Sequence, residues 1–142
     1  MKTVFKSSAA LLLAVALLLC ATACGDKVAK EGLWKDATYL NDTTFGKGAK
    51  TVEVEVKAGE QSITFTIKTD KATLADALLE HKLVAGEESQ YGLYVKVVNG
   101  ITADYDVDQS YWAFCKNGEM MMVGVSSAEI ADGEHYELVY TK

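Results

Sequence analysis

Residues 51–67 read TVEVEVKAGEQSITFTI, and this stretch decides the fold class. Valines alternate with glutamates in its first half, and Ile63, Phe65 and Ile67 alternate with threonines in its second half. An apolar residue at every second position is typical of a strand with one buried and one exposed face. Because Gly59 falls in a short turn between the two runs, the stretch predicts a β-hairpin.

The spacing of the apolar residues changes after this hairpin. Thr73 and Asp76 have the spacing of a capping box, in which a hydroxyl caps the first turn of a helix. These spacings predict one amphipathic helix, which ends near residues 84–86 and covers the apolar face of a sheet. The leucines that form its apolar stripe are Leu74, Leu78, Leu79 and Leu83.

Further strands follow the helix, separated by turn pairs that contain glycine. Because only one helix is available as a crossover, the order of elements predicts an α+β domain with a sheet of about five to six strands. The expected strands cover 93–97, 111–116, 120–125 and about 136–140, and the turn pairs are Asn99-Gly100, Asn117-Gly118 and Asp132-Gly133.

The start of the chain has the layout of a secretory signal, with Lys2 and Lys6 before an apolar run over 9–19. This run is shorter than the about 20 residues that a membrane-spanning helix needs. Small residues then precede Cys24 in the sequence ATAC, which resembles a bacterial lipobox.

We therefore expect a signal peptide over 1–23, a lipidated Cys24 with a polar tether over 24–49, and one domain over 50–142. The expected location is the outer face of the cytoplasmic membrane. Ordinary secretion with cleavage after Ala23 is the alternative.

Charge excludes several classes of partner. The chain has a net charge of −6, and removal of Lys2 and Lys6 with the signal would make it −8. A negative chain repels nucleic-acid phosphates, so nucleic acid is not an expected partner. All 14 basic residues are lysines, so the chain contains no arginine. Recognition of a carboxylate or phosphate by a planar guanidinium is therefore not expected.

The acidic segment around Asp104, Asp106 and Asp108 begins like a calcium loop. A calcium loop of this kind needs glycine at its sixth position and glutamate at its twelfth, where this chain has Gln109 and Cys115. A solvated acidic loop is the expected structure, and a non-classical calcium site is the alternative.

Other candidate chemistry is weak. Residues 124–128 approach the nucleophile elbow of hydrolases but lack its final glycine. His81 and His135 are isolated from other ligands at metal-binding spacing, and Cys115 lies within an aromatic strand, where a buried packing role is expected. We expect no enzymatic activity and no metal site.

Aromatic and methionine residues are concentrated between residues 91 and 122. Alternation places Trp112 and Phe114 on one face, which we expect to pack on the helix, and Tyr111 and Ala113 on the other. The second face, together with the neighbouring turns, predicts an apolar platform for a flat ligand or a partner.

An ordered set of short motifs runs through the second half of the chain: 73–79 (TLADALL), 92–95 (GLYV), 98–101 (VNGI), 111–114 (YWAF), 117–119 (NGE), 124–125 (GV) and 131–133 (ADG). This set resembles a bacterial domain of unknown function that is similar to the C-terminal domain of transcobalamin and intrinsic factor. The resemblance covers roughly residues 50–142. It implies a β-grasp-like mixed sheet with one covering helix, and cobalamin binding or another role in uptake at the cell surface.

The expected function is therefore a surface-anchored, non-enzymatic lipoprotein that binds cobalamin or a related corrinoid for a membrane transporter. Cobalamin would be a ligand, and no cofactor is expected. The alternative is a protein-interaction or adhesion module with no small-molecule ligand. The candidate ligand-binding residues are Tyr111, Trp112, Asn99, Asn117 and Met121.

Overall fold

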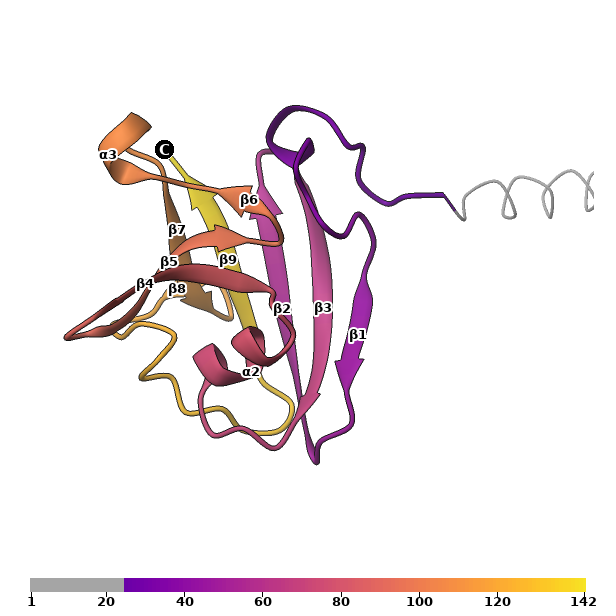
Figure 1. The fold of residues 1–142 in the computed structure, drawn as a ribbon. Helices are drawn as coiled ribbons and strands as arrows, with labels where there is room; N and C mark the ends of the chain where they lie inside the picture. The colour runs from indigo at the N-terminus through magenta and orange to yellow at the C-terminus, as the bar shows by residue number, and fades with distance from the viewer. Residues whose placement is uncertain (1–24) are drawn as a thin grey trace, which may run out of the picture.

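The computed structural model describes residues 25–142, which form an α+β fold with two sheets (Figure 1). The described strands are β1 (Thr43–Gly46), β2 (Lys50–Ala58), β3 (Gln61–Thr69), β4 (Val84–Ser89), β5 (Gly92–Val98), β6 (Ile101–Thr102), β7 (Tyr111–Lys116), β8 (Glu119–Met120) and β9 (His135–Thr141). The helical elements are a 3-10 turn η1 (Gly32–Trp34), α2 (Leu74–Glu80) and α3 (Tyr105–Asp108).

The larger sheet is mixed, as expected. Its six strands lie in the order β1-β3-β2-β9-β7-β8, and the smaller sheet has the order β4-β5-β6. Strand β2 is parallel to β9, and β1 is parallel to β3, while the other pairs are antiparallel. The prediction of an α+β fold with a mixed sheet is confirmed.

The predicted hairpin of β2 and β3 is confirmed, and the two strands are antiparallel. Val54 lies opposite Phe65, and Val56 lies opposite Ile63. The inward side chains of both strands are fully buried, whereas the glutamates between the valines face outward. The alternation in the sequence therefore identifies two strands whose inward side chains are fully buried.

Helix α2 begins where the sequence predicted it, because the Thr73 hydroxyl accepts a hydrogen bond from the backbone N–H of Asp76. It ends earlier than expected. The chain leaves the helix after Glu80, Lys82 adopts a left-handed conformation (φ 56°), and β4 begins at Val84. Residues 84–86 are therefore part of a strand and not of the helix.

The smaller sheet covers the part of the larger sheet that α2 does not reach (Figure 1). Seven helical residues span roughly 10 Å, whereas the nine residues of β2 span roughly 30 Å. Trp112 accordingly packs beneath β5, where its indole N–H donates to the carbonyl of Lys96. The expectation that the Trp112 face packs on the helix is wrong, because a short helix leaves this area to β5.

The segment before β2 differs from the expected tether. Val28 and Trp34 are buried, and the Trp34 indole donates to the Ala58 carbonyl at 2.9 Å. Strand β1 extends the sheet, so the chain is part of the folded body from Val28 onward. The buried residues of this segment have no regular period, which is why the sequence did not reveal them.

The expected strand over 120–125 is also shorter than predicted. Only Glu119–Met120 forms β8, and residues 121–130 run as irregular chain. The expected signal peptide and Cys24 lie outside the described residues. Within residues 25–142, no helix has the length and apolar character to cross a membrane.

Candidate functional site

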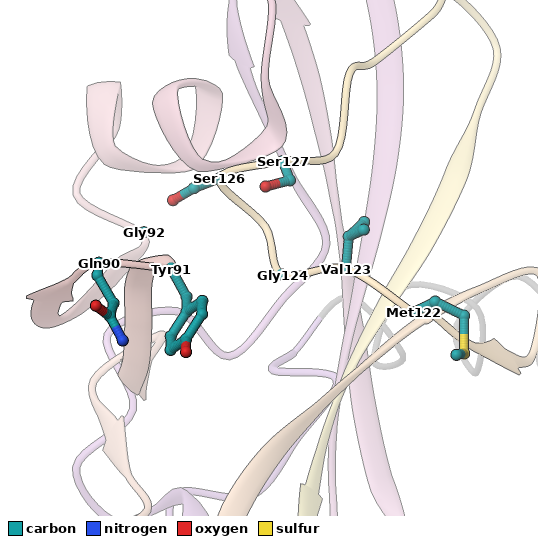
Figure 2. Close-up of a pocket in the computed structure, with 8 residues that line it drawn as sticks. All are labelled: Gln90, Tyr91, Gly92, Met122, Val123, Gly124, Ser126 and Ser127. Carbon is teal, nitrogen blue, oxygen red and sulfur yellow. The ribbon is translucent and has the colours of Figure 1, made fainter.

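A pocket of about 550 Å³ opens between the turn that joins β4 to β5 and the irregular segment after β8 (Figure 2). Its volume lies in the range of small-molecule sites. The lining residues are Gln90, Tyr91, Gly92, Met122, Val123, Gly124, Ser126 and Ser127. These eight described residues include no charged side chain.

Large apolar side chains stand exposed at the pocket. Tyr91 is 82% exposed, Met122 is 97% exposed and Val123 is 45% exposed. Tyr91 and Met122 come from the two different segments that form the pocket, as Figure 2 shows. Exposed apolar side chains gathered at a concave surface are typical of a binding site.

A close contact joins the two segments at one end of the pocket. The Ser126 hydroxyl accepts a hydrogen bond from the backbone N–H of Leu93 at 2.9 Å. Gly92 has φ +95°, and a Cβ placed on it would lie 2.6 Å from the Ser126 Cβ. Glycine is therefore required at position 92, both by its backbone conformation and by the approach of Ser126.

The irregular segment is also fixed to the start of α2. The backbone N–H of Ala75 donates to the Val125 carbonyl at 3.0 Å, and that of Leu74 donates to the Ala128 carbonyl at 2.9 Å. These bonds anchor residues 125–128, while Met122 and Val123 project from the same segment toward solvent. One wall of the pocket is thus fixed to the start of α2 at residues 125–128 and carries the exposed apolar side chains of Met122 and Val123.

A smaller apolar cavity of about 140 Å³ adjoins this pocket. Both cavities are lined by Gly124, and the smaller one is lined also by Trp112 and Phe114. Trp112 is 7% exposed and lies beneath β5. Because it lines the cavity that adjoins the pocket, its fluorescence should change when a ligand binds there.

The structure does not bring the five candidate ligand-binding residues into one site. The Asn99 side chain is buried and holds both backbone polar groups of Tyr39, accepting from its N–H and donating to its carbonyl. Trp112 lies beneath β5. None of the five is among the residues that line the pocket of Figure 2.

The remaining candidates lie apart from one another. Tyr111 packs against Tyr105 of α3 with ring centroids 6.5 Å apart, and Asn117 occupies the turn between β7 and β8 with φ 52°. Met121 directly precedes the pocket residue Met122, and its backbone N–H donates to the Phe114 carbonyl. Met121 is thus the predicted residue nearest in sequence to the pocket.

Sequence reasoning missed Tyr91 and Met122. Tyr91 lies in a polar turn between two strands, and a large aromatic residue at such a turn was the available signal. The sequence predicts a strand over 120–125, in which alternation would determine whether Met122 is buried. In the structure β8 ends at Met120, and Met122 is exposed in the irregular segment that follows.

The acidic segment forms the short helix α3 and its cap. Asp104 accepts from the backbone N–H of Asp106, and Asp108 accepts from the backbone N–H of Ser110. Hydrogen bonds from the Ser110 hydroxyl and N–H hold the pKa of Asp108 below its usual value, despite some desolvation. In the described part of the chain, no group of three or more His, Cys, Asp and Glu residues is arranged to hold a metal ion.

Comparison with known proteins identifies relatives of the fold. No curated protein matches the chain significantly. A crystal structure of a "putative metal binding protein" from Ruminococcus gnavus is 32% identical, with a TM-score of 0.62, over 66% of this chain and 97% of that one. Haptocorrin, in a crystal structure of its complex with Cbi, shares the fold at 21% identity and a TM-score of 0.51.

The haptocorrin match covers 69% of this chain but only 26% of haptocorrin. The family described as a domain of unknown function, DUF4430, matches residues 71–142, which is 72 of the 142 residues. That segment contains α2, the smaller sheet, β7–β9 and the whole pocket of Figure 2. The chain therefore belongs to the DUF4430 family.

Proposed function

We propose that this protein is a surface-anchored binding module that captures a flat small molecule with an apolar ring face and a polar edge, with a corrinoid as the first ligand to test. The observation that carries the proposal is the pocket with Tyr91 on one segment and Met122 on the other. An aromatic ring offers a rigid surface for stacking, and a thioether side chain adapts to an irregular partner.

The polarity of the pocket supports a neutral ligand. Its described lining contains an amide, two serine hydroxyls and several apolar side chains, but no charge. The hydroxyls of Ser126 and Ser127 can bond polar groups at the edge of a ligand whose face contacts Tyr91. A strongly charged ligand would find no opposite charge among these residues.

The fold shared with haptocorrin supports the choice of a corrinoid. That protein is described in complex with Cbi, and this chain corresponds to about a quarter of its length. A domain of this size can cover one face of such a ligand, so a transporter or a second protein would cover the other face. We propose a role in delivering the ligand for uptake.

The sequence around Cys24 supports the anchoring part of the proposal. A lipid on Cys24 would hold the domain at the outer face of the cytoplasmic membrane. The folded body begins at Val28, four residues later, so the connection between the lipid and the domain would be short. This short connection would keep the domain close to the membrane and to a transporter. Mass spectrometry of the protein from its native membrane would show an acylated Cys24 as its first residue.

Calorimetric titration with cobalamin tests the binding proposal. We expect saturable binding of one ligand per chain, accompanied by a change in tryptophan fluorescence that is absent in Trp112→Phe. Tyr91→Ala and Met122→Ala should each weaken binding about tenfold, equivalent to roughly 1.4 kcal/mol.

Tyr105→Ala is the matched control, since Tyr105 is an exposed tyrosine on α3 that does not line the pocket. Unchanged affinity in this variant would assign the effect to Tyr91 itself. Absence of heat and of any fluorescence change at high micromolar cobalamin would refute the corrinoid proposal.

A protein-interaction module is the second candidate, favoured by strand β4. This strand has one neighbour in its sheet, and five of its six residues are exposed. An open strand edge can pair with an extended segment of a partner protein. Recovery of one stoichiometric partner from the native envelope, lost when Glu88→Pro alters the exposed edge of β4 but retained in Tyr91→Ala, would favour this function.

A further inference from the structure

A second group of potential ligands lies on the outward face of β7 and β9, separate from the pocket. Cys115 and Met120 face each other across the hairpin of β7 and β8, with 3.8 Å between Sγ and Sδ. At this distance the Cys115 thiol donates a weak hydrogen bond to the Met120 thioether. The distance also matches the ~3.8 Å that separates two ligands lying ~2.3 Å from a tetrahedral metal, so one ion could replace the thiol proton between the two sulfurs.

Glu137 lies beside this sulfur pair. It is the partner of Cys115 in the register of β7 and β9, so both side chains occupy the same face of the sheet. Glu137 is 9% exposed, and its Oε1 accepts a hydrogen bond from the backbone N–H of Gly118 at 2.8 Å. Its Oε2 is buried and has no hydrogen-bond partner among residues 25–142.

A buried carboxylate oxygen without a partner is costly, because its lost hydration is not replaced. Lys57 forms its ion pair with Glu55 at 3.3 Å. The His135 Nε2 lies 3.8 Å from the other oxygen of Glu137, Oε1, so neither Lys57 nor His135 contacts Oε2. Burial and then the charge of Glu137 raise the pKa of the Cys115 thiol, while the charge of Lys57 lowers it. A bound cation would compensate the carboxylate and replace the thiol proton.

We propose that Cys115, Met120 and Glu137 form a binding site for a soft monovalent cation, Cu(I). Thiolate and thioether ligands select Cu(I) over hard cations, which prefer oxygen. Binding would form the Cys115 Sγ–Cu bond and release the thiol proton to solvent, with no change in oxidation state. Met120 is 63% exposed, so the ion can reach the site from solvent.

Competition with a chromogenic Cu(I) chelator under anaerobic conditions tests this site. The full chain is used in detergent with Cys20→Ser and Cys24→Ser, which leaves Cys115 as its one thiol. We expect one Cu(I) per chain, loss of binding in Cys115→Ser, and at least about tenfold weaker binding in Met120→Leu and in Glu137→Gln. Glu137→Gln keeps an oxygen for the Gly118 N–H while removing the charge.

Met122→Leu is the matched control, because Met122 is an exposed methionine of the pocket and not of this site. It should bind Cu(I) as the parent does, and X-ray absorption should show two sulfur neighbours in the parent but one in Met120→Leu. Unchanged affinity in Met120→Leu, an equal loss in Met122→Leu, or no stoichiometric binding by the parent would each overturn the proposal.

Discussion

The β2–β3 hairpin and the edge of the pocket contain similar apolar side chains in opposite environments. In the hairpin, Val54 and Phe65 are fully buried, whereas Tyr91 and Met122 at the pocket are almost fully exposed. The hairpin residues alternate strictly with polar ones, and the pocket residues lie in a turn and in irregular chain. Apolar residues in a regular pattern thus build the core, and those outside the pattern remain available for a ligand.

This difference separates stability from binding. Removing a hairpin side chain leaves a cavity that the surrounding structure cannot fill. Removing a pocket side chain exposes no buried surface, so the folded state loses little. Substitutions in the two regions should therefore give opposite patterns of unfolding and ligand affinity.

The largest effect on stability is expected from Phe65→Ala. Phe65 is fully buried and contacts the rings of Tyr39 and Phe45 edge to face, with centroids 5.7 and 5.5 Å away. Loss of this ring should lower the free energy of unfolding by about 3–5 kcal/mol, measured by urea denaturation. A loss below about 1 kcal/mol would mean that the hairpin is not the centre of the core.

A smaller effect is expected from Asn99→Ala, with Asn117→Ala as its control. Both asparagines precede glycine in a turn with φ 52°, but only Asn99 is buried and bonded to both backbone groups of Tyr39. Asn99→Ala should cost about 2–4 kcal/mol, because it leaves those groups unpaired and adds left-handed strain. Asn117→Ala should show only the strain, about 1 kcal/mol, and equal losses would contradict the role of Asn99.

The third prediction concerns acid stability at the start of β1, where Asp42 contacts the backbone of β3. The backbone N–H of Thr64 donates to Asp42 and, with the Lys27 ammonium, holds the pKa of Asp42 below 3.8 despite partial desolvation. A lowered carboxyl pKa gives stability that is present above 3.8 and is lost as the pH falls through the folded-state value.

Asp42→Asn keeps an acceptor for the Thr64 N–H but cannot titrate. Its melting temperature should therefore fall less than that of the parent between pH 4 and pH 2. The measurement is a series of thermal melts across this range. Identical acid dependence in the two proteins would contradict the contribution of Asp42.

The smallest effect on stability is expected at the pocket. Tyr91→Ala and Met122→Ala should each change the free energy of unfolding by less than about 0.5 kcal/mol, because both side chains are exposed. The same variants should show the largest losses in ligand affinity. A large loss of stability in either would assign these side chains to the core instead of the pocket.

The regular parts of the fold were predictable from the sequence. Alternation identified β2, β3 and β5, the Thr73 cap identified the start of α2, and Asn117-Gly118 identified the turn after β7. Each of these signals is local, since it depends on the period of a strand or on the backbone conformation of one turn.

The parts that were not predictable depend on contacts between distant residues. Trp34 is buried because it reaches the Ala58 carbonyl, 24 residues away, and Asn99 is buried because it reaches Tyr39, 60 residues away. The pocket likewise requires the docking of Leu93 on Ser126. No periodic signal reports such contacts, so the strand faces and turns visible in the sequence do not locate the pocket.

The most direct test of the central claim is amide NMR mapping of the labelled protein during titration with cobalamin. We predict that the chemical-shift changes concentrate at residues 90–92 and 122–127, with a smaller change at the indole of Trp112 and none along β2 and β3. Changes centred on Tyr111 and Asn117 with none at 90–92, or no changes at all, would contradict the assignment of this pocket as the ligand site.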